Sequence, residues 1–203
     1  MNEETYIDSP LVVGISGASG SIIASRLVDA LIQRDVKVAL IASHASRIVW
    51  KQEMDESFGE FLERTVETGR VTNFHIGDIQ APMASGTYPV RGMVIVPCSM
   101  ATVAALATGL ADNLLRRAAD VCFKERRPIT IIPRETPLSQ LHLENLSKLA
   151  SMGANIIPPQ PAFYLKPKSV DDIVEFLVQR VLVASGITNV LPHDIRYNGP
   201  IVK

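Results

Sequence analysis

Four short segments of this sequence, each rich in glycine or in polar side chains, follow runs of apolar residues. The first is GISGASG, from Gly14 to Gly20. Glycine lets the backbone come close to a ligand, and the first turn of a following helix offers unpaired N–H groups to a phosphate. The spacing is neither the dinucleotide GxGxxG pattern nor a P-loop, so it indicates another kind of anion-binding loop. A plain tight turn, with Ser19 as the N-cap of the next helix, is the alternative.

Hydroxyl groups mark the second and third segments. Ser43 follows an apolar run, and the segment PCSMAT places Ser99 and Thr102 after another. Each hydroxyl on its own is more typical of a helix N-cap than of a ligand contact. The fourth segment is PRETPL, in which Arg134 and Glu135 follow a further apolar run. A guanidinium group suits phosphate and the neighbouring carboxylate can transfer a proton, whereas the alternative for these two residues is a surface ion pair.

The apolar runs have the length and composition of buried strands, and segments with helical spacing of apolar residues separate them. The predicted strands are 11–15, 36–42, 92–96, 128–133 and 154–157. The predicted helices are 21–34, a segment running through Trp50 and Glu53, 58–67, 101–107, 113–124, 139–152 and 170–184. Alternating strands and helices predict an α/β fold with a doubly wound parallel sheet and helices on both faces. The four segments then meet at the edge where the strands end, which is where such sheets bind ligands.

Three further expectations concern individual elements. Helix 139–152 is expected to be amphipathic, with Leu141, Leu146 and Leu149 on its apolar side. The region 55–91 is more polar and is expected to hold one helix and a turn-rich loop. Residues 158–164, PPQPAFY, predict a rigid extended loop because three prolines restrict the backbone.

The stretch 92–111 is nearly uncharged and about as long as a membrane span. We interpret it differently, because Pro97 follows a β-branched run and Ser99 then opens an alanine-rich helical pattern. The stretch therefore predicts a buried strand, a turn and a packed helix. Helices on both faces of a parallel sheet explain why such a strand is continuously apolar.

The composition favours one domain. The chain has 203 residues, of which 47% are hydrophobic, and its formal net charge of -1 favours neither nucleic acid nor an anionic membrane. We expect a disordered lead-in at 1–10 without signal-peptide features, a single domain at 11–190, and a tail at 191–203 that could lie across a neighbouring subunit. Cys98 and Cys122 form no metal or disulfide pattern, which fits a reducing cytoplasm. Cys98 has no basic neighbour that would make it a nucleophile.

Six motifs in this order resemble the flavin prenyltransferase family (UbiX type), from about Leu11 to Ser185. They are GISGASG, the loop at Ser43, PCSMAT, ADNLLRRAADVCFKERRP, PRETPL and PPQPAFY. The resemblance implies a flavodoxin-like, three-layer αβα fold, FMN bound between subunits, and a homododecamer. It also implies that the FMN contacts are Gly17, Ala18, Ser19, Ser43, Ser99, Met100, Ala101, Thr102 and Arg134.

The same resemblance implies that the enzyme joins a dimethylallyl group to N5 and C6 of reduced FMN without a metal, and supplies prenylated FMN to a UbiD-type decarboxylase. The phosphate of dimethylallyl monophosphate would be surrounded by Lys124, Glu135, Tyr164 and Arg180, with Glu53 nearby and Ser19 relaying a proton. These residue types suit the reaction, because loss of an allylic phosphate needs cations and a proton donor at the leaving group.

Each of these side chains also has a simpler interpretation. Lys124 could be a solvated charge at a helix end, Arg180 a polar-face residue, Tyr164 a core residue and Glu53 part of a helix surface. Two other functions stay open: an FMN-binding carrier or accessory subunit of a decarboxylase, and a flavin-dependent cysteine decarboxylase with His44 as base. The PASANT-like and PxMNxxMW-like motifs of the cysteine decarboxylases are absent here.

Overall fold

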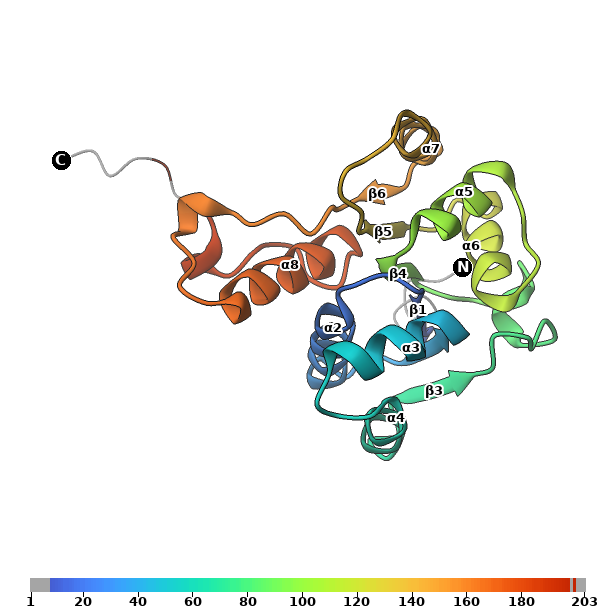
Figure 1. The fold of residues 1–203 in the computed structure, drawn as a ribbon. Helices are drawn as coiled ribbons and strands as arrows, with labels where there is room; N and C mark the ends of the chain where they lie inside the picture. The colour runs from blue at the N-terminus through green and yellow to red at the C-terminus, as the bar shows by residue number, and fades with distance from the viewer. Residues whose placement is uncertain (1–7, 198, 200–203) are drawn as a thin grey trace.

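The computed structural model describes residues 8–197 and 199. Most of the expected lead-in at 1–10, and positions 198 and 200–203 of the expected tail, lie outside the described residues. Six parallel strands form one sheet in the order β3-β2-β1-β4-β5-β6 (Figure 1). The strands are β1 (Leu11–Ile15), β2 (Val38–Ala42), β3 (Val71–Phe74), β4 (Gly92–Cys98), β5 (Ile129–Pro133) and β6 (Asn155–Ile156).

The order of the strands confirms the predicted doubly wound sheet. The first strand, β1, pairs with β2 on one side and with β4 on the other, so that Leu11 lies opposite both Val38 and Gly92. If the edge strand β3 is left out, the remaining order is β2-β1-β4-β5-β6. This is the flavodoxin-like order, in which the first strand lies between the second and the third. The strand order therefore reverses between β1 and β4, which is where the ends of the strands leave a crevice for a ligand.

Helices cover both faces of the sheet, as the predicted αβα layers require. The helices are α2 (Ser21–Gln33), α3 (His44–Glu53), α4 (Phe58–Val66), α5 (Met100–Thr108), α6 (Leu114–Lys124), α7 (Gln140–Ser151) and α8 (Val170–Ala184). One apolar core packs the sheet against α2 and α8, and the other packs it against α5, α6 and α7. In β1, Val13 belongs to the first core and Val12 to the second, so neither face tolerates a polar residue.

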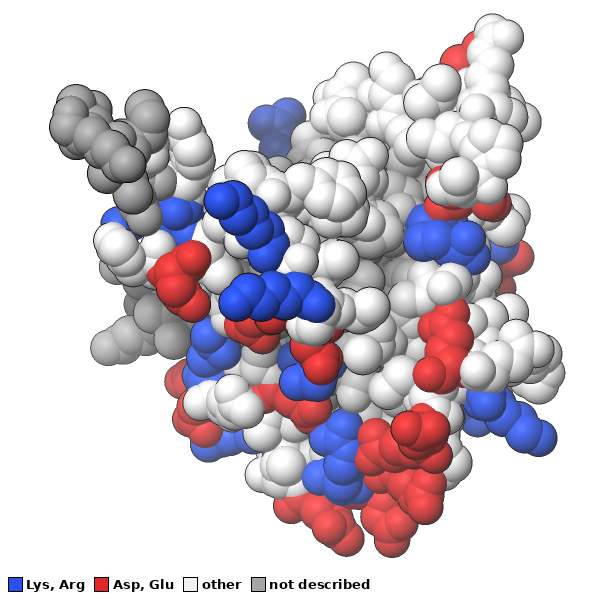
Figure 2. Space-filling model, turned by 60° about the vertical axis from the view of Figure 1, so that its left-hand side comes forward, with Lys and Arg blue, Asp and Glu red and all other residues white. Residues whose placement is uncertain are grey.

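The stretch 92–111 forms β4, a turn and α5, which confirms the interpretation made from the sequence. Every residue of β4 is buried because the strand lies in the middle of the sheet. Among the described residues, no helix combines the length and the hydrophobicity needed to cross a membrane. On the face shown in Figure 2, basic and acidic side chains are interspersed, so this face has no broad basic surface for a polyanion.

Three expectations about individual elements were wrong. The region 55–91 contains an unpredicted strand, β3, in which only Val71 is fully buried because it lies at the sheet edge. Leu141 was expected on the apolar side of α7 but is 62% exposed, whereas Leu149 is buried. The physical reason is that α7 packs mainly on α5, so only a narrow stripe of the surface of α7 is buried. The segment PPQPAFY ends in a short 3-10 helix, η2 (Phe163–Leu165), rather than remaining extended.

Candidate functional site

A buried serine joins the two strands on either side of the switch point. Ser16 follows β1 directly, and its hydroxyl donates a hydrogen bond of 3.1 Å to the carbonyl of Pro97. The same hydroxyl accepts a hydrogen bond of 2.8 Å from the backbone N–H of Ser99. The glycine-rich loop and the turn before α5 are therefore held together at the edge where the strands end. Ser16 was not among the residues expected at the site, although it lies within the GISGASG motif.

Backbone hydrogen bonds attach the other two segments to the same edge. The N–H of Ser43 donates to the carbonyl of Ile15 over 2.9 Å, and the N–H of Arg134 donates to the carbonyl of Cys98 over 3.1 Å. All four predicted segments thus meet beyond the carboxyl ends of β1, β2, β4 and β5. This confirms the prediction that they share one edge of the sheet.

The glycine-rich loop lies against the start of α3. A Cβ atom added to Gly17 would come within 2.5 Å of the Cβ of Ala45, which is closer than real Cβ atoms approach. Gly20 has a φ angle of 120°, a conformation that L residues with side chains rarely adopt. At these two positions glycine is explained by packing and backbone conformation. A ligand is not needed to explain it.

The first N–H groups of α2 are hydrogen-bonded to a protein carboxylate, which corrects the expectation that they are unpaired and available to a phosphate. Glu53, the last residue of α3, accepts hydrogen bonds from the N–H of Gly20 at 3.0 Å and of Ser21 at 2.8 Å. Desolvation raises the pKa of Glu53, but hydrogen bonds from Ser19, Ser21 and Gly20 together outweigh it and lower the pKa below the ordinary value of 4.5. Glu53 therefore acts as an anion at the positive end of α2.

We expect this contact to make stability depend on pH in the acid range. Because the pKa of Glu53 is lower in the folded chain, its stabilising contribution is complete above the unfolded value of 4.5 and is lost as the pH falls through the folded pKa. The Glu53→Gln variant lacks this contribution. Its free energy of unfolding in urea should lie below that of the wild type at pH 7, and the difference should shrink below pH 4.5. A difference that is the same at both pH values would contradict the assignment.

Two of the predicted hydroxyl groups, those of Ser43 and Ser99, are helix N-caps, as the simpler interpretation held. Ser43 caps α3 by accepting from the N–H of Ser46 at 3.1 Å, and Ser99 caps α5 by accepting from the N–H of Thr102 at 3.3 Å. The hydroxyls of Ser99 and Thr102 lie 3.1 Å apart. A hydroxyl that accepts in a cap still has its own O–H to donate, so a cap does not prevent contact with a ligand. The other two predicted contacts of this segment, Met100 and Ala101, begin α5.

Arg134 has the property expected of a ligand-binding residue. Its Nε atom is buried and has no hydrogen-bond partner within the described part of the chain. A buried donor left without an acceptor costs about 1–3 kcal/mol, so an acceptor from a ligand would be stabilising there. Glu135, the next residue, is exposed, and its carboxylate accepts a hydrogen bond of 3.0 Å from the N–H of Thr136. Hydroxyls and a guanidinium group with a free buried donor at one edge suit a ligand that carries an anionic group such as phosphate.

Lys124 lies at the opposite edge of the sheet. It is the last residue of α6, and β5 begins shortly afterwards at Ile129, so Lys124 lies near the edge where the strands begin. Across a strand of five residues the two edges are about 16 Å apart. The ammonium of Lys124 is paired with the carboxylate of Glu125. One copy of the chain therefore does not bring Lys124 to its own glycine-rich loop.

The other two predicted phosphate-binding residues belong to the C-terminal part of the chain. Here α8 packs on α2, and the segments before and after α8 project away from the sheet (Figure 1). Tyr164 lies on η2, is 56% exposed and packs edge-to-face on Tyr197 with ring centroids 5.6 Å apart. It is therefore not a core residue. Arg180 lies on the exposed side of α8, one turn before Ala184, whose carbonyl accepts from the side chain of Asn155 at the start of β6.

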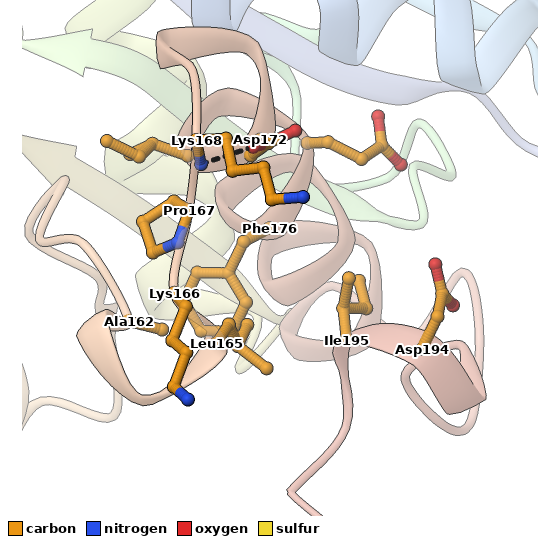
Figure 3. Close-up of a pocket in the computed structure, with 11 residues that line it drawn as sticks. Ala162, Leu165, Lys166, Pro167, Lys168, Asp172, Phe176, Asp194 and Ile195 are labelled. Atoms are coloured by element: carbon orange, nitrogen blue, oxygen red, sulfur yellow. Dashed lines mark hydrogen bonds between the residues drawn. The ribbon is translucent and has the colours of Figure 1, made fainter.

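A cavity of 310 Å³ lies in this projecting part, between η2, α8 and the C-terminal segment (Figure 3). Apolar side chains, including Leu165, Phe176 and Ile195, line it together with Lys166 and Asp172. None of the predicted site residues lines this cavity. We therefore assign the candidate site to the strand ends.

Cys98 and His44 also lie near the strand ends. Cys98 is fully buried, and burial raises the pKa of its thiol to about 12, which confirms that it is a packed residue rather than a nucleophile. His44 is exposed at the start of α3. Within the described residues, no group of three or more His, Cys, Asp or Glu side chains could hold a metal ion.

Comparison with known proteins gives consistent matches over most of the chain. A model of the Flavoprotein family matches residues 2–182. The flavin prenyltransferase LpdB of Lactiplantibacillus plantarum is 48% identical over 190 residues, which cover 93% of this chain and 98% of that protein. A dodecameric FMN-dependent UbiX-like decarboxylase from Escherichia coli O157:H7 has a TM-score of 0.85 at 37% identity, covering 94% of this chain and 100% of the other. The structure of AnUbiX (PadA1) with FMN and dimethylallyl pyrophosphate has a TM-score of 0.85 at 36% identity, with coverage of 94% and 98%.

Proposed function

We propose a function from one premise: this chain belongs to the flavin prenyltransferase family, within the wider Flavoprotein family. It transfers a dimethylallyl group from dimethylallyl phosphate to N5 and C6 of reduced FMN. The prenylated FMN then serves a UbiD-type decarboxylase. The observation that carries this proposal is that four strand-end segments meet at Arg134, whose buried Nε has no acceptor among the residues that the structure describes.

The residues at the strand ends suit the binding of FMN. The loop of Gly17, Ala18 and Ser19 offers backbone groups at the switch point, and Ser43 offers a hydroxyl at the start of α3. The first turn of α5, from Ser99 through Met100 and Ala101 to Thr102, offers two more hydroxyls. Arg134 supplies a positive charge and an unpaired donor. Because Glu53 already binds the N–H groups of Gly20 and Ser21, the phosphate of FMN is held by other groups than these.

The remaining site residues act on the leaving phosphate. Bound reduced FMN would supply N5 and C6 as nucleophiles. N5 would take the carbon that loses the phosphate and release its own proton, and C6 would add to the prenyl double bond as that bond gains a proton and C6 loses one. As the C–O bond of dimethylallyl phosphate breaks, the phosphate keeps the electron pair and becomes more negative. Lys124 and Arg180 stabilise this charge, Tyr164 donates a hydrogen bond and Glu135 delivers a proton. Ser19, which precedes Gly20 in the loop that Glu53 binds, relays a proton at the flavin.

The site is completed by several copies of the chain. Lys124 lies across the sheet from its own glycine-rich loop, so it can serve only the flavin of a neighbouring copy. Large apolar side chains are exposed on the projecting C-terminal part, among them Phe163 at 75%, Val170 at 69% and Tyr197 at 66%. Such exposure favours burial against another subunit. We propose a dodecamer, the assembly named for the Escherichia coli neighbour. Its compartment is the cytoplasm, because Cys98 and Cys122 are both free thiols.

Anaerobic incubation with reduced FMN and dimethylallyl monophosphate tests this function. We expect mass spectrometry to find a flavin that is heavier by one prenyl group, and no such product when dimethylallyl phosphate is left out. A second candidate is an FMN-binding accessory subunit, because the Escherichia coli neighbour is described as a decarboxylase. If FMN binds and its mass never changes, the transferase function is wrong and the accessory role is favoured.

A further inference from the structure

The last residue of the short 3-10 helix η1 (Pro82–Ala84) and the loop after it are bonded to two arginines, one in α6 and one after it. Arg117 donates from Nε to the carbonyl of Ala84 over 3.0 Å, and Arg127 donates from Nη2 to the carbonyl of Gly86 over 2.7 Å. Hydrogen bonds from a charged donor are stronger than those between neutral groups. The backbone at Ala84 and Gly86 is therefore held in place.

The Lys124–Glu125 ion pair lies directly against this fixed backbone. A Cβ atom added to Gly86 would overlap the Nζ of Lys124 and the Oε1 of Glu125, and would come within 2.9 Å of the Cδ of Glu125. Gly86 is absent from the glycines with positive φ among the described residues, so its backbone conformation does not require glycine. The missing side chain instead provides the space that the two charged groups occupy. A hydrogen bond from Lys124 is the main cause that lowers the pKa of Glu125, which keeps this carboxylate charged beside the ammonium.

We infer that Gly86 is a positioning residue for Lys124, setting where its ammonium can meet the phosphate of the prenyl donor. This inference rests on the proposed function, in which Lys124 binds that phosphate. Lysine carries its charge on a flexible stem of four carbons, so neighbouring groups must define where the charge lies. Here the backbone of Gly86 restricts the position of the Lys124 ammonium on one side, and the ion pair with Glu125 restricts it on the other. A side chain at position 86 would displace both charged groups, since the loop itself is fixed.

The Gly86→Ala variant tests the inference. The new methyl group would meet the movable ends of two side chains and not backbone, so the protein should fold with little change in its unfolding transition. We expect kcat/KM for dimethylallyl monophosphate to fall about tenfold or more, as for the weakening of one charged hydrogen bond, while the Kd for FMN stays the same. Gly59→Ala is the matched control, because a Cβ at Gly59 in α4 meets only the Oγ of Ser57 at 3.8 Å.

A double-mutant cycle with Lys124→Ala separates positioning from a general structural effect. If Gly86 acts through Lys124, adding Gly86→Ala to Lys124→Ala should cause almost no further loss of kcat/KM. Additive losses, an unchanged kcat/KM in Gly86→Ala, or failure of Gly86→Ala to fold would each overturn the inference. Failure of the proposed function looks different: the wild type would then form no prenylated flavin, or Lys124→Ala would be fully active.

Discussion

Replacing Glu135 with Gln should lower kcat for flavin prenylation by about 100- to 1,000-fold, the effect of deleting one group that stabilises developing charge. The Kd for FMN should stay unchanged. Glu135 follows Arg134 at the end of β5, and its exposed carboxylate makes a hydrogen bond only to the N–H of the next residue among the contacts of the described chain. Glutamine keeps the size and can still accept that hydrogen bond. It cannot deliver a proton to the departing phosphate.

The measurement combines steady-state prenylation under anaerobic conditions with FMN titration. Glu63→Gln in α4 is the control, because it removes another exposed carboxylate that belongs to no predicted site. Parallel losses of FMN binding and turnover in Glu135→Gln would indicate a structural role. Activity within tenfold of the wild type would show that another group supplies the proton.

Mixed assemblies should recover activity from two inactive variants. Lys124→Ala removes a cation and Glu135→Gln removes the proton donor, and each variant alone should be nearly inactive. Glu135 lies at the same edge as the glycine-rich loop of its own chain. The reason is that the N–H of the preceding Arg134 donates to the carbonyl of Cys98, and the turn after Cys98 is bonded to Ser16 of that loop. Lys124 lies at the other edge of the sheet, so in the proposed site it would come from a second copy. With random mixing of equal amounts, both groups are intact in about one site in four, so about a quarter of the wild-type activity should return.

Coexpression with two different affinity tags and tandem purification would isolate the mixed assemblies for assay. A mixture of Lys124→Ala with wild-type chains is the reference for the activity of mixed assemblies, since about half of its sites should stay intact. No recovery in the double mixture would contradict a site shared between copies. Recovery above the statistical fraction would also contradict it, because independent mixing cannot exceed that fraction.

The buried centre of this fold was predictable because burial on two faces leaves a simple pattern. In β1, β4 and β5 every residue is buried, so the sequence of each strand is a continuous apolar run. The edge strand β3 lacks this pattern, since only Val71 of its four residues is fully buried. Helix α7 shows the same limit: Leu149 is covered by the body of the protein, and Leu141 is exposed. The spacing of leucines along the chain indicates a helix, but it does not indicate how much of the helix surface another element covers.

The location of the site was predictable for a related reason. Parallel strands all end at the same edge, so unusual residues after several strands must lie close together, as Ser43, Ser99 and Arg134 do. The contacts within the site were not predictable. Glu53 binds the start of α2 from 33 positions away along the chain, and no local pattern in either segment indicates that contact. The N–H groups predicted to be free for a phosphate are therefore bonded to the protein itself.

The sequence by itself determines which chemical groups are present. It also determines that most of them follow the ends of strands, because local hydrophobic periodicity shows where each strand stops. Which groups share one pocket follows from the direction of each helix in three dimensions. Lys124 and Arg134 are close in the chain, yet α6 ends where β5 begins and Arg134 follows the end of β5. The full length of a strand separates the two residues, so distance along the chain is a poor guide to distance across the sheet. Folding therefore places Lys124 and Arg134 at different edges of the sheet.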